Sequence, residues 1–252
     1  KSQKMKQLIF FLFLITSIDL KGQILELNYR SPEKKESQFK ISLFKQYLVG
    51  VNTLGHIDLS GEVMSINYSS SGGFMGGLTV IGTTNLFYSN KDDRKNNLSH
   101  LLNPMGGING SFYFLLPLLN NEKNSLKLSS RFGIKWIEGR ALKGFENYFL
   151  SEYLMSGVVH QRLIFEDALE NQRVDFWVYP HLMASQVGEE NLEVFFDNTI
   201  ESQNYGFGLQ TGLVINRKLR LVFLLNQFLS SSVPETTGIP VLRFTVGYRF
   251  RT

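Results

Sequence analysis

The sequence predicts an all-β fold: a transmembrane, antiparallel, up-and-down β-barrel of about ten strands, with eight or twelve as the neighbouring possibilities. Three observations lead to this prediction. Apolar and polar residues alternate in repeated segments, short and long connections alternate between these segments, and the sequence ends in the apolar ladder VLRFTVGYRFRT. A chain of 252 residues is long enough for one large β domain.

The clearest alternation runs from Ser125 to Glu138. Successive side chains of a strand point to opposite faces of a sheet, so residues with even numbers and residues with odd numbers (the two parities) lie on different faces. One parity carries Leu126, Leu128, Phe132, Ile134 and Trp136, and the other carries Lys127, Ser129, Arg131 and Lys135. A strand with one apolar face and one charged face is typical of a wall between lipid and a polar lumen.

The same alternation locates the remaining strands, with boundaries good to a few residues. They are predicted at residues 39–51, 55–68, 73–88, 106–119, 125–139, 154–167, 173–187, 203–216, 218–229 and 240–251. The segment ILELNYR, at residues 24–30, is a further short strand or a lead-in to the barrel.

The connections are sorted by length after the third predicted strand. On one side lie the short turns NNEKN, DALENQ and NRK, joined by SSSGG after the second strand. On the other side lie NKDDRKNNLSHLLNP, RALKGFENYFLSEY, GEENLEVFFDNTIES and SSSVPETTGI. Bacterial outer-membrane barrels sort their loops in this way, with short periplasmic turns and long external loops. We expect the apolar stretch LEVFFDN to fold over the barrel mouth.

The positions of aromatic and charged residues also agree with a barrel wall that has one face toward lipid and one toward the lumen. Aromatic side chains on the apolar parity mark two belts, an outer one with Tyr88, Trp136 and Tyr205 and an inner one with Phe39, Phe176, Tyr248 and Phe250. Charged residues on the other parity are predicted to point inward: Lys127, Arg131, Lys135, Arg220, Arg243, Arg249, Asp58 and Glu62. Because inward charges need partners, a lumen of this size is expected to be largely filled by paired side chains.

Residues 1–22 are predicted to be a secretory signal, and residues 23–252 a single barrel domain. Lys4 and Lys6 flank the first methionine, Met5, and the apolar run from Leu8 to Ile18 is too short to span a bilayer but fits an export signal. Removing residues 1–22 lowers the formal charge from +4 to about +1. The remaining chain therefore has no large positive charge that would attract a nucleic acid. With no cysteine, the exported chain has neither disulfides nor a lipid-anchored thiol.

The chain resembles the outer-membrane β-barrel proteins of Gram-negative bacteria. The resemblance covers residues 23–252 as an architecture, and its most specific element is the last strand. In that family the barrel-assembly machinery reads alternate apolar residues that end in an aromatic one. The matching residues here are Leu242, Phe244, Val246, Tyr248 and Phe250. Arg251 and Thr252 follow the final aromatic and depart from the pattern. The resemblance implies an outer-membrane location, with lipid and lipopolysaccharide as neighbours, and it transfers no catalytic residue.

One cluster of polar residues is a candidate site in the lumen. His160, Arg162 and Glu166 share the parity taken as inward on the sixth predicted strand, and Asp175, Tyr179, His181 and Ser185 share it on the seventh. A turn centred between Glu170 and Asn171 would place His160 opposite His181, Arg162 opposite Tyr179 and Glu166 opposite Asp175. One interpretation is an acid–base or nucleophilic site with a histidine base. The other interpretation is that inward polar side chains form hydrogen bonds and ion pairs with one another without a chemical role. The sequence favours this second interpretation.

No motif in the sequence identifies a chemical reaction. The stretch SGGFMGGLTVIG lacks the Lys-Ser/Thr of a phosphate loop, and the sequence contains neither HExxH nor GxSxG. No cofactor is therefore expected. We expect a non-enzymatic barrel that supports the envelope or binds an unidentified surface partner through its external loops. A barrel-embedded hydrolase of envelope lipid or peptide, and a narrow pore or hydrophobic-ligand transporter, are the alternatives.

Overall fold

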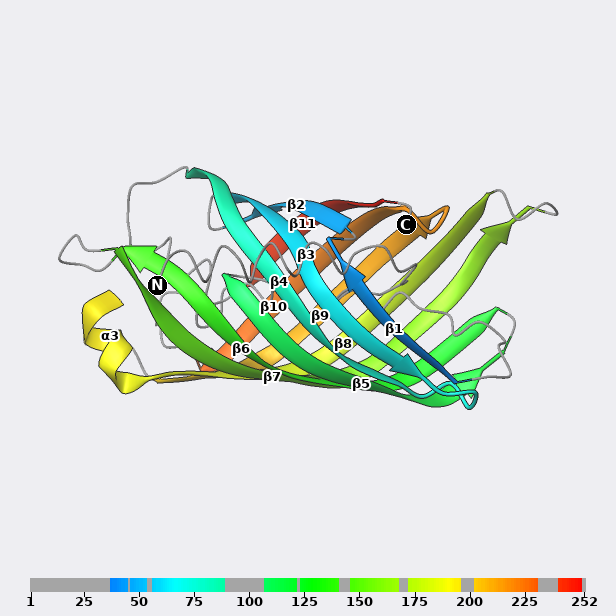
Figure 1. The fold of residues 1–252 in the computed structure, drawn as a ribbon, viewed down its shortest axis with the longest axis horizontal. Helices are drawn as coiled ribbons and strands as arrows, with labels where there is room; N and C mark the ends of the chain where they lie inside the picture. The colour runs from blue at the N-terminus through cyan, green and yellow to red at the C-terminus, as the bar shows by residue number, and fades with distance from the viewer. Residues whose placement is uncertain are drawn as a thin grey trace, which may run out of the picture.

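The computed structural model is an antiparallel β-barrel with strongly tilted strands (Figure 1). It describes residues 37–44, 46–53, 56–88, 107–121, 123–140, 146–167, 172–195, 202–230 and 240–250. Within these ranges, ten antiparallel strands close into the barrel, which confirms the predicted fold class. The predicted signal segment, residues 24–30 and most of the predicted external loops lie outside the described residues.

The strands follow the chain around the barrel. Their bounds are β1 (Gln38–Leu43), β2 (Gln46–Asn52), β3 (His56–Ser69), β4 (Met75–Tyr88), β5 (Ile108–Asn120), β6 (Asn124–Arg140), β7 (Glu146–Glu166), β8 (Arg173–Val187), β9 (Gln203–Ile215), β10 (Leu219–Ser230) and β11 (Val241–Arg249). Each strand from β3 to β10 pairs with the next along the chain, and β11 pairs with β2 to close the ring.

β1 and β2 are two parts of one barrel strand. Both pair with β3, β1 with residues 64–69 and β2 with residues 57–61. The interruption between them falls at Phe44, whose φ of 46° is in the left-handed region that side chains seldom adopt. Counting β1 and β2 together gives the predicted number of strands.

The two faces of the wall differ as predicted. On β6, Lys127, Arg131 and Lys135 are buried, whereas Phe132 and Trp136 are exposed. The remaining charges predicted to point inward are likewise buried or half-buried: Asp58, Glu62, Arg220, Arg243 and Arg249. The described wall therefore encloses these charges and presents large apolar side chains outward, the reverse of a soluble protein.

The described aromatic side chains of both predicted belts lie on the outer face. Trp136 and Tyr205 are exposed near one end of their strands, and Phe39, Tyr248 and Phe250 are exposed near the other end. Phe250 meets Tyr47 and Tyr248 edge to face, with ring centroids 5.8 and 5.3 Å apart. Phe176 is half-buried, and the side chain of Tyr88 lies outside the described part.

The long loops hold more regular structure than the sequence predicts. β7 begins at Glu146 rather than at residue 154, because residues 146–153 pair with residues 133–140 of β6. A short helix, α3 (Glu189–Phe195), lies inside the connection after β8 and stands at one end of the barrel (Figure 1). Phe195 is buried and Val194 is exposed, so part of LEVFFDN packs against the protein.

Candidate functional site in the barrel lumen

Among the histidines whose side chains the structure describes, His181 points into the barrel and is buried. Its Nδ1 lies 3.1 Å from the carbonyl oxygen of Tyr179, which can only accept, so Nδ1 carries the proton and donates. The neutral ring then presents Nε2 as an acceptor. The imidazole stacks on the ring of Tyr179, with centroids 4.6 Å apart and planes 20° apart. His181 is therefore held in one orientation by its own strand.

Glycines flank His181 on both neighbouring strands. Gly157 of β7 and Gly208 of β9 are its register partners. A β-carbon at Gly208 would lie 2.4 Å from His181 Nε2 and 2.6 Å from Oδ1 of Asn226, the β10 residue in the same register. The imidazole and the amide therefore share the space that a side chain at Gly208 would occupy.

His160 and Arg162 do not join His181, and the predicted pairing is wrong. His160 pairs with Val178, Arg162 pairs with Phe176, and His181 pairs with Gly157. On β7 the buried side chains have odd numbers, such as Tyr153 and Gln161, so His160 and Arg162 lie on the outer face. Both parities of this strand mix apolar and polar residues, so polarity does not identify the inner face here, and the prediction that it does is wrong.

Glu166 returns to the inner face because β7 contains a bulge. The register shifts between Leu163 and Phe165, which exchanges the two parities beyond that point. Glu166 then faces Arg173 rather than the predicted Asp175. Arg173 donates from Nη1 to Glu166 Oε1 at 2.9 Å and from Nε to Asp175 Oδ2 at 2.7 Å. Glu166 and Asp175 thus form an ion-pair cluster at the end of the barrel, away from His181.

The described lumen does not assemble a nucleophile with a base around His181. Ser185 is on the inner side of β8, but it is four residues from His181, roughly 13 Å at ~3.3 Å per residue. The Nδ1 of His181 is engaged by a carbonyl rather than by a carboxylate that would orient it for catalysis. Among the described residues, no three His, Cys, Asp or Glu side chains gather as metal ligands.

Large inward side chains lie along the wall, each crossing a glycine to reach a polar partner two strands away. Arg243 of β11 crosses Gly50 of β2 and donates to Asp58 of β3. Tyr153 of β7 crosses Gly133 of β6 and donates to Asn109 of β5 at 2.8 Å.

The same arrangement recurs at Tyr113 of β5. Its hydroxyl donates to Asn67 of β3, and Gly77 of the intervening β4 is in register with both residues. The glycines therefore place bulky lumen side chains against the sheet and fix their partners.

Basic groups outnumber acidic groups in this interior. Within the described residues, the buried basic side chains are Lys127, Arg131, Lys135, Arg173, Arg220 and Arg243, against the acidic Asp58, Glu62 and Asp175. Two of the basic groups also approach tyrosine rings: Arg131 Cζ lies 5.8 Å from the centroid of Tyr113, and Lys135 Nζ lies 5.0 Å from that of Tyr153. Such cation–π contacts stabilise a buried positive charge.

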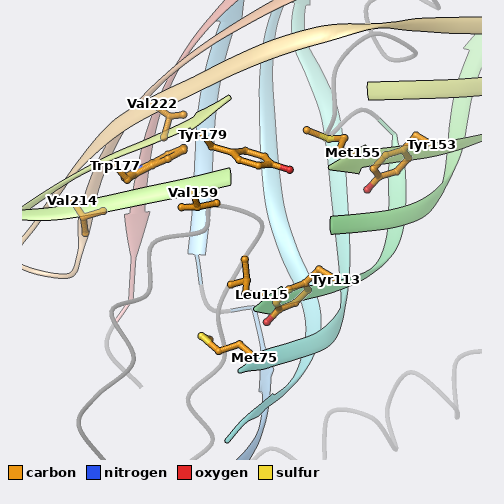
Figure 2. Close-up of a cluster of buried hydrophobic side chains, with 10 residues drawn as sticks. All are labelled: Met75, Tyr113, Leu115, Tyr153, Met155, Val159, Trp177, Tyr179, Val214 and Val222. Atoms are coloured by element: carbon orange, nitrogen blue, oxygen red, sulfur yellow. The ribbon is translucent and has the colours of Figure 1, made fainter. Parts of the chain in front are cut away.

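An apolar and aromatic cluster interrupts the polar interior, which the alternation of polar and apolar residues does not predict. Ten side chains from β4 to β10 project into one shared space (Figure 2): Met75, Tyr113, Leu115, Tyr153, Met155, Val159, Trp177, Tyr179, Val214 and Val222. Trp177 lies over Gly212 of β9, where a β-carbon would be 2.8 Å from its Nε1. The inward glycines of β9 were the available signal, because each one permits a bulky neighbour.

In the described part of the chain, no helix has the length and apolarity needed to cross a bilayer. No family model and no curated protein matches the chain. Among solved structures, the chain is similar to the NanC porin in its rhombohedral crystal form, at 6% sequence identity and a TM-score of 0.37. That likeness covers 82% of this chain and 100% of the porin chain. At this distance it adds nothing to what the strand pairing shows.

Proposed function

We propose that the protein is an integral outer-membrane barrel of a Gram-negative envelope, inserted by the barrel-assembly machinery. The polarity of its two faces carries the proposal. In water, exposing Phe112, Leu154, Phe207 and Phe244 while burying Arg220 and Lys135 would oppose the hydrophobic effect. In a bilayer the same arrangement is favourable, because the exposed side chains meet lipid and closure of the sheet satisfies the backbone.

The assembly step is supported by the last strand. Phe244, Val246, Tyr248 and Phe250 are all exposed on one face of β11 and its end, and Leu242 shares their parity. This outward row is the feature that the family resemblance associates with recognition by the assembly machinery.

Within that membrane, we propose a structural or surface-binding role rather than wide diffusion. The aromatic cluster fills part of the described interior, and Trp177, Glu62 and Asn226 are fully buried. Side chains that cross glycines also tie neighbouring strands together at several levels of the wall. A barrel packed and braced in this way is suited to a fixed support for external loops.

A charge on the outer wall tests the membrane location. Phe112→Arg is expected to lower the free energy of unfolding by about 2 kcal/mol in lipid vesicles and to slow insertion, because Phe112 would face acyl chains. Exposed surface substitutions in a soluble protein usually change stability by less than about 0.5 kcal/mol. Denaturant titration of vesicle-inserted protein, followed by tryptophan fluorescence and heat-dependent gel mobility, provides the measurement. A stable, monomeric protein in detergent-free buffer would contradict the proposal.

A narrow anion-selective passage is the second candidate, favoured by the excess of buried basic groups over acidic ones. The two candidates differ in planar bilayers. The packed barrel is expected to insert without a steady current. A steady current that favours anions, and whose selectivity falls on Lys135→Glu, would replace the first candidate with the second.

A further inference from the structure

The outer wall carries a polar surface across β6, β7, β8 and β9, close to the level of the outer aromatic belt, with Gln203 two residues from Tyr205 on β9. Glu152, Gln186 and Gln203 occupy one register row, in which Glu152 pairs with Gln186 and Gln186 pairs with Gln203. All three side chains are exposed. On β6 and β7 the next outward residues toward the barrel end are the apolar Trp136 and Leu150, so Glu152 lies within the apolar wall.

A hollow lies beside this polar row. The adjacent outward row runs across the same four strands through Phe132, Leu154, Ala184 and Tyr205. Ala184 is the one small side chain in it, and the wall is indented there by a hollow of about 280 Å³ whose lining includes Glu152, Gln186 and Gln203. Tyr205, 52% exposed, rises directly beside Ala184.

Two serines extend the polar surface toward the middle of the wall. Ser130 and Ser156 are a register pair on β6 and β7, with hydroxyl oxygens 2.8 Å apart. Acyl chains offer no hydrogen bonds, so polar groups at this depth of a membrane wall are usually turned toward protein. The amides of Gln186 and Gln203 both donate and accept, so their N–H groups are suited to a carboxylate such as that of Glu152.

We propose that a second copy of this chain docks here, forming a two-fold dimer through β6–β9. This inference rests on the membrane location proposed above. An axis along the membrane normal keeps both copies in the same orientation and makes the surface meet itself. Tyr205 of each copy then enters the hollow over Ala184 of the other, and the Gln186 and Gln203 amides of one copy reach Glu152 of the other. A single surface supplies the knob, the hollow, the donors and the acceptor.

The absence of cysteine from the sequence makes the test direct, because one introduced thiol can react only with a second copy. Gln186→Cys in lipid vesicles, treated with a short bis-maleimide, is expected to give several times the cross-linked dimer of Val49→Cys. Val49 is also exposed, on β2, away from the proposed interface. Adding Ala184→Trp fills the hollow and is expected to reduce the yield of Gln186→Cys to that of the Val49→Cys control.

Heat-dependent gel mobility of each variant separates the two proposals. Inserted barrels with equal cross-linking at residues 186 and 49 would overturn the dimer and leave the membrane location intact. Inserted monomers that retain a phospholipid, and lose it on Ala184→Trp, would assign the hollow to lipid and also overturn the dimer. Protein that never enters vesicles would overturn the membrane location, and the dimer with it.

Discussion

Replacing Arg243 with alanine is expected to lower the free energy of unfolding by about 3–5 kcal/mol, because the change leaves Asp58 as an uncompensated buried charge. The two side chains are 3% and 1% exposed. Beyond the arginine, Asp58 has the hydroxyl of Ser60 at 3.4 Å, a long contact that cannot replace a charged donor. Denaturant titration in lipid vesicles, followed by fluorescence of Trp136 and Trp177, measures the loss.

Removing both charges separates the cost of an orphaned carboxylate from the value of the ion pair. The double variant Asp58→Leu with Arg243→Met is expected to recover most of the lost stability, because apolar replacements of a buried pair are often close to neutral. Lys218→Ala, in the exposed turn between β9 and β10, serves as the control and should change stability by less than about 0.5 kcal/mol. A loss below about 1 kcal/mol for Arg243→Ala would show that Asp58 has another adequate partner.

Strand positions and wall polarity were predictable where one parity of a strand is clearly apolar. β6 is such a case, with Lys127, Arg131 and Lys135 opposite Phe132 and Trp136, and the structure confirms each assignment. The bounds predicted for β8, residues 173–187, agree with the structure as well. In these strands one face is apolar and meets lipid while the other is polar and faces the lumen, so the polarity of a residue identifies its face.

β7 was predicted poorly because its two faces are chemically alike. Its outer face carries Glu152, Ser156, His160 and Arg162, and its inner face carries Met155 and Val159 among others. Polarity therefore gave the wrong side for His160 and Arg162. The local sequence also does not mark the bulge that returns Glu166 to the inner face.

The lumen partners were beyond the reach of periodicity because they join strands that are not neighbours. Arg243 and Asp58 lie on β11 and β3, with β2 between them. Sequence alternation assigns each residue a face, but it does not state which strands close the ring. Gly50 becomes informative only when closure places it beneath the Arg243 guanidinium.

If inward glycines make room for side chains that cross them, adding one methyl group should disrupt a specific contact. Gly133→Ala is expected to lower the free energy of unfolding by about 2–4 kcal/mol, combining overpacking with a disrupted buried hydrogen bond. The new β-carbon would lie 2.5 Å from the ring of Tyr153, whose hydroxyl bonds Asn109. Vesicle unfolding titrations measure the change.

Gly110→Ala is the control for the backbone effect, because a β-carbon at this outward position of β5 meets nothing within 4 Å. We expect it to be neutral or to stabilise the barrel by up to about 1 kcal/mol, since alanine loses less backbone entropy than glycine on folding. In a Tyr153→Ala background, Gly133→Ala should cost little further, because the ring that it would strike is gone. An equal loss in both backgrounds would show that glycine at residue 133 serves the strand backbone, and not the passage of Tyr153 to Asn109.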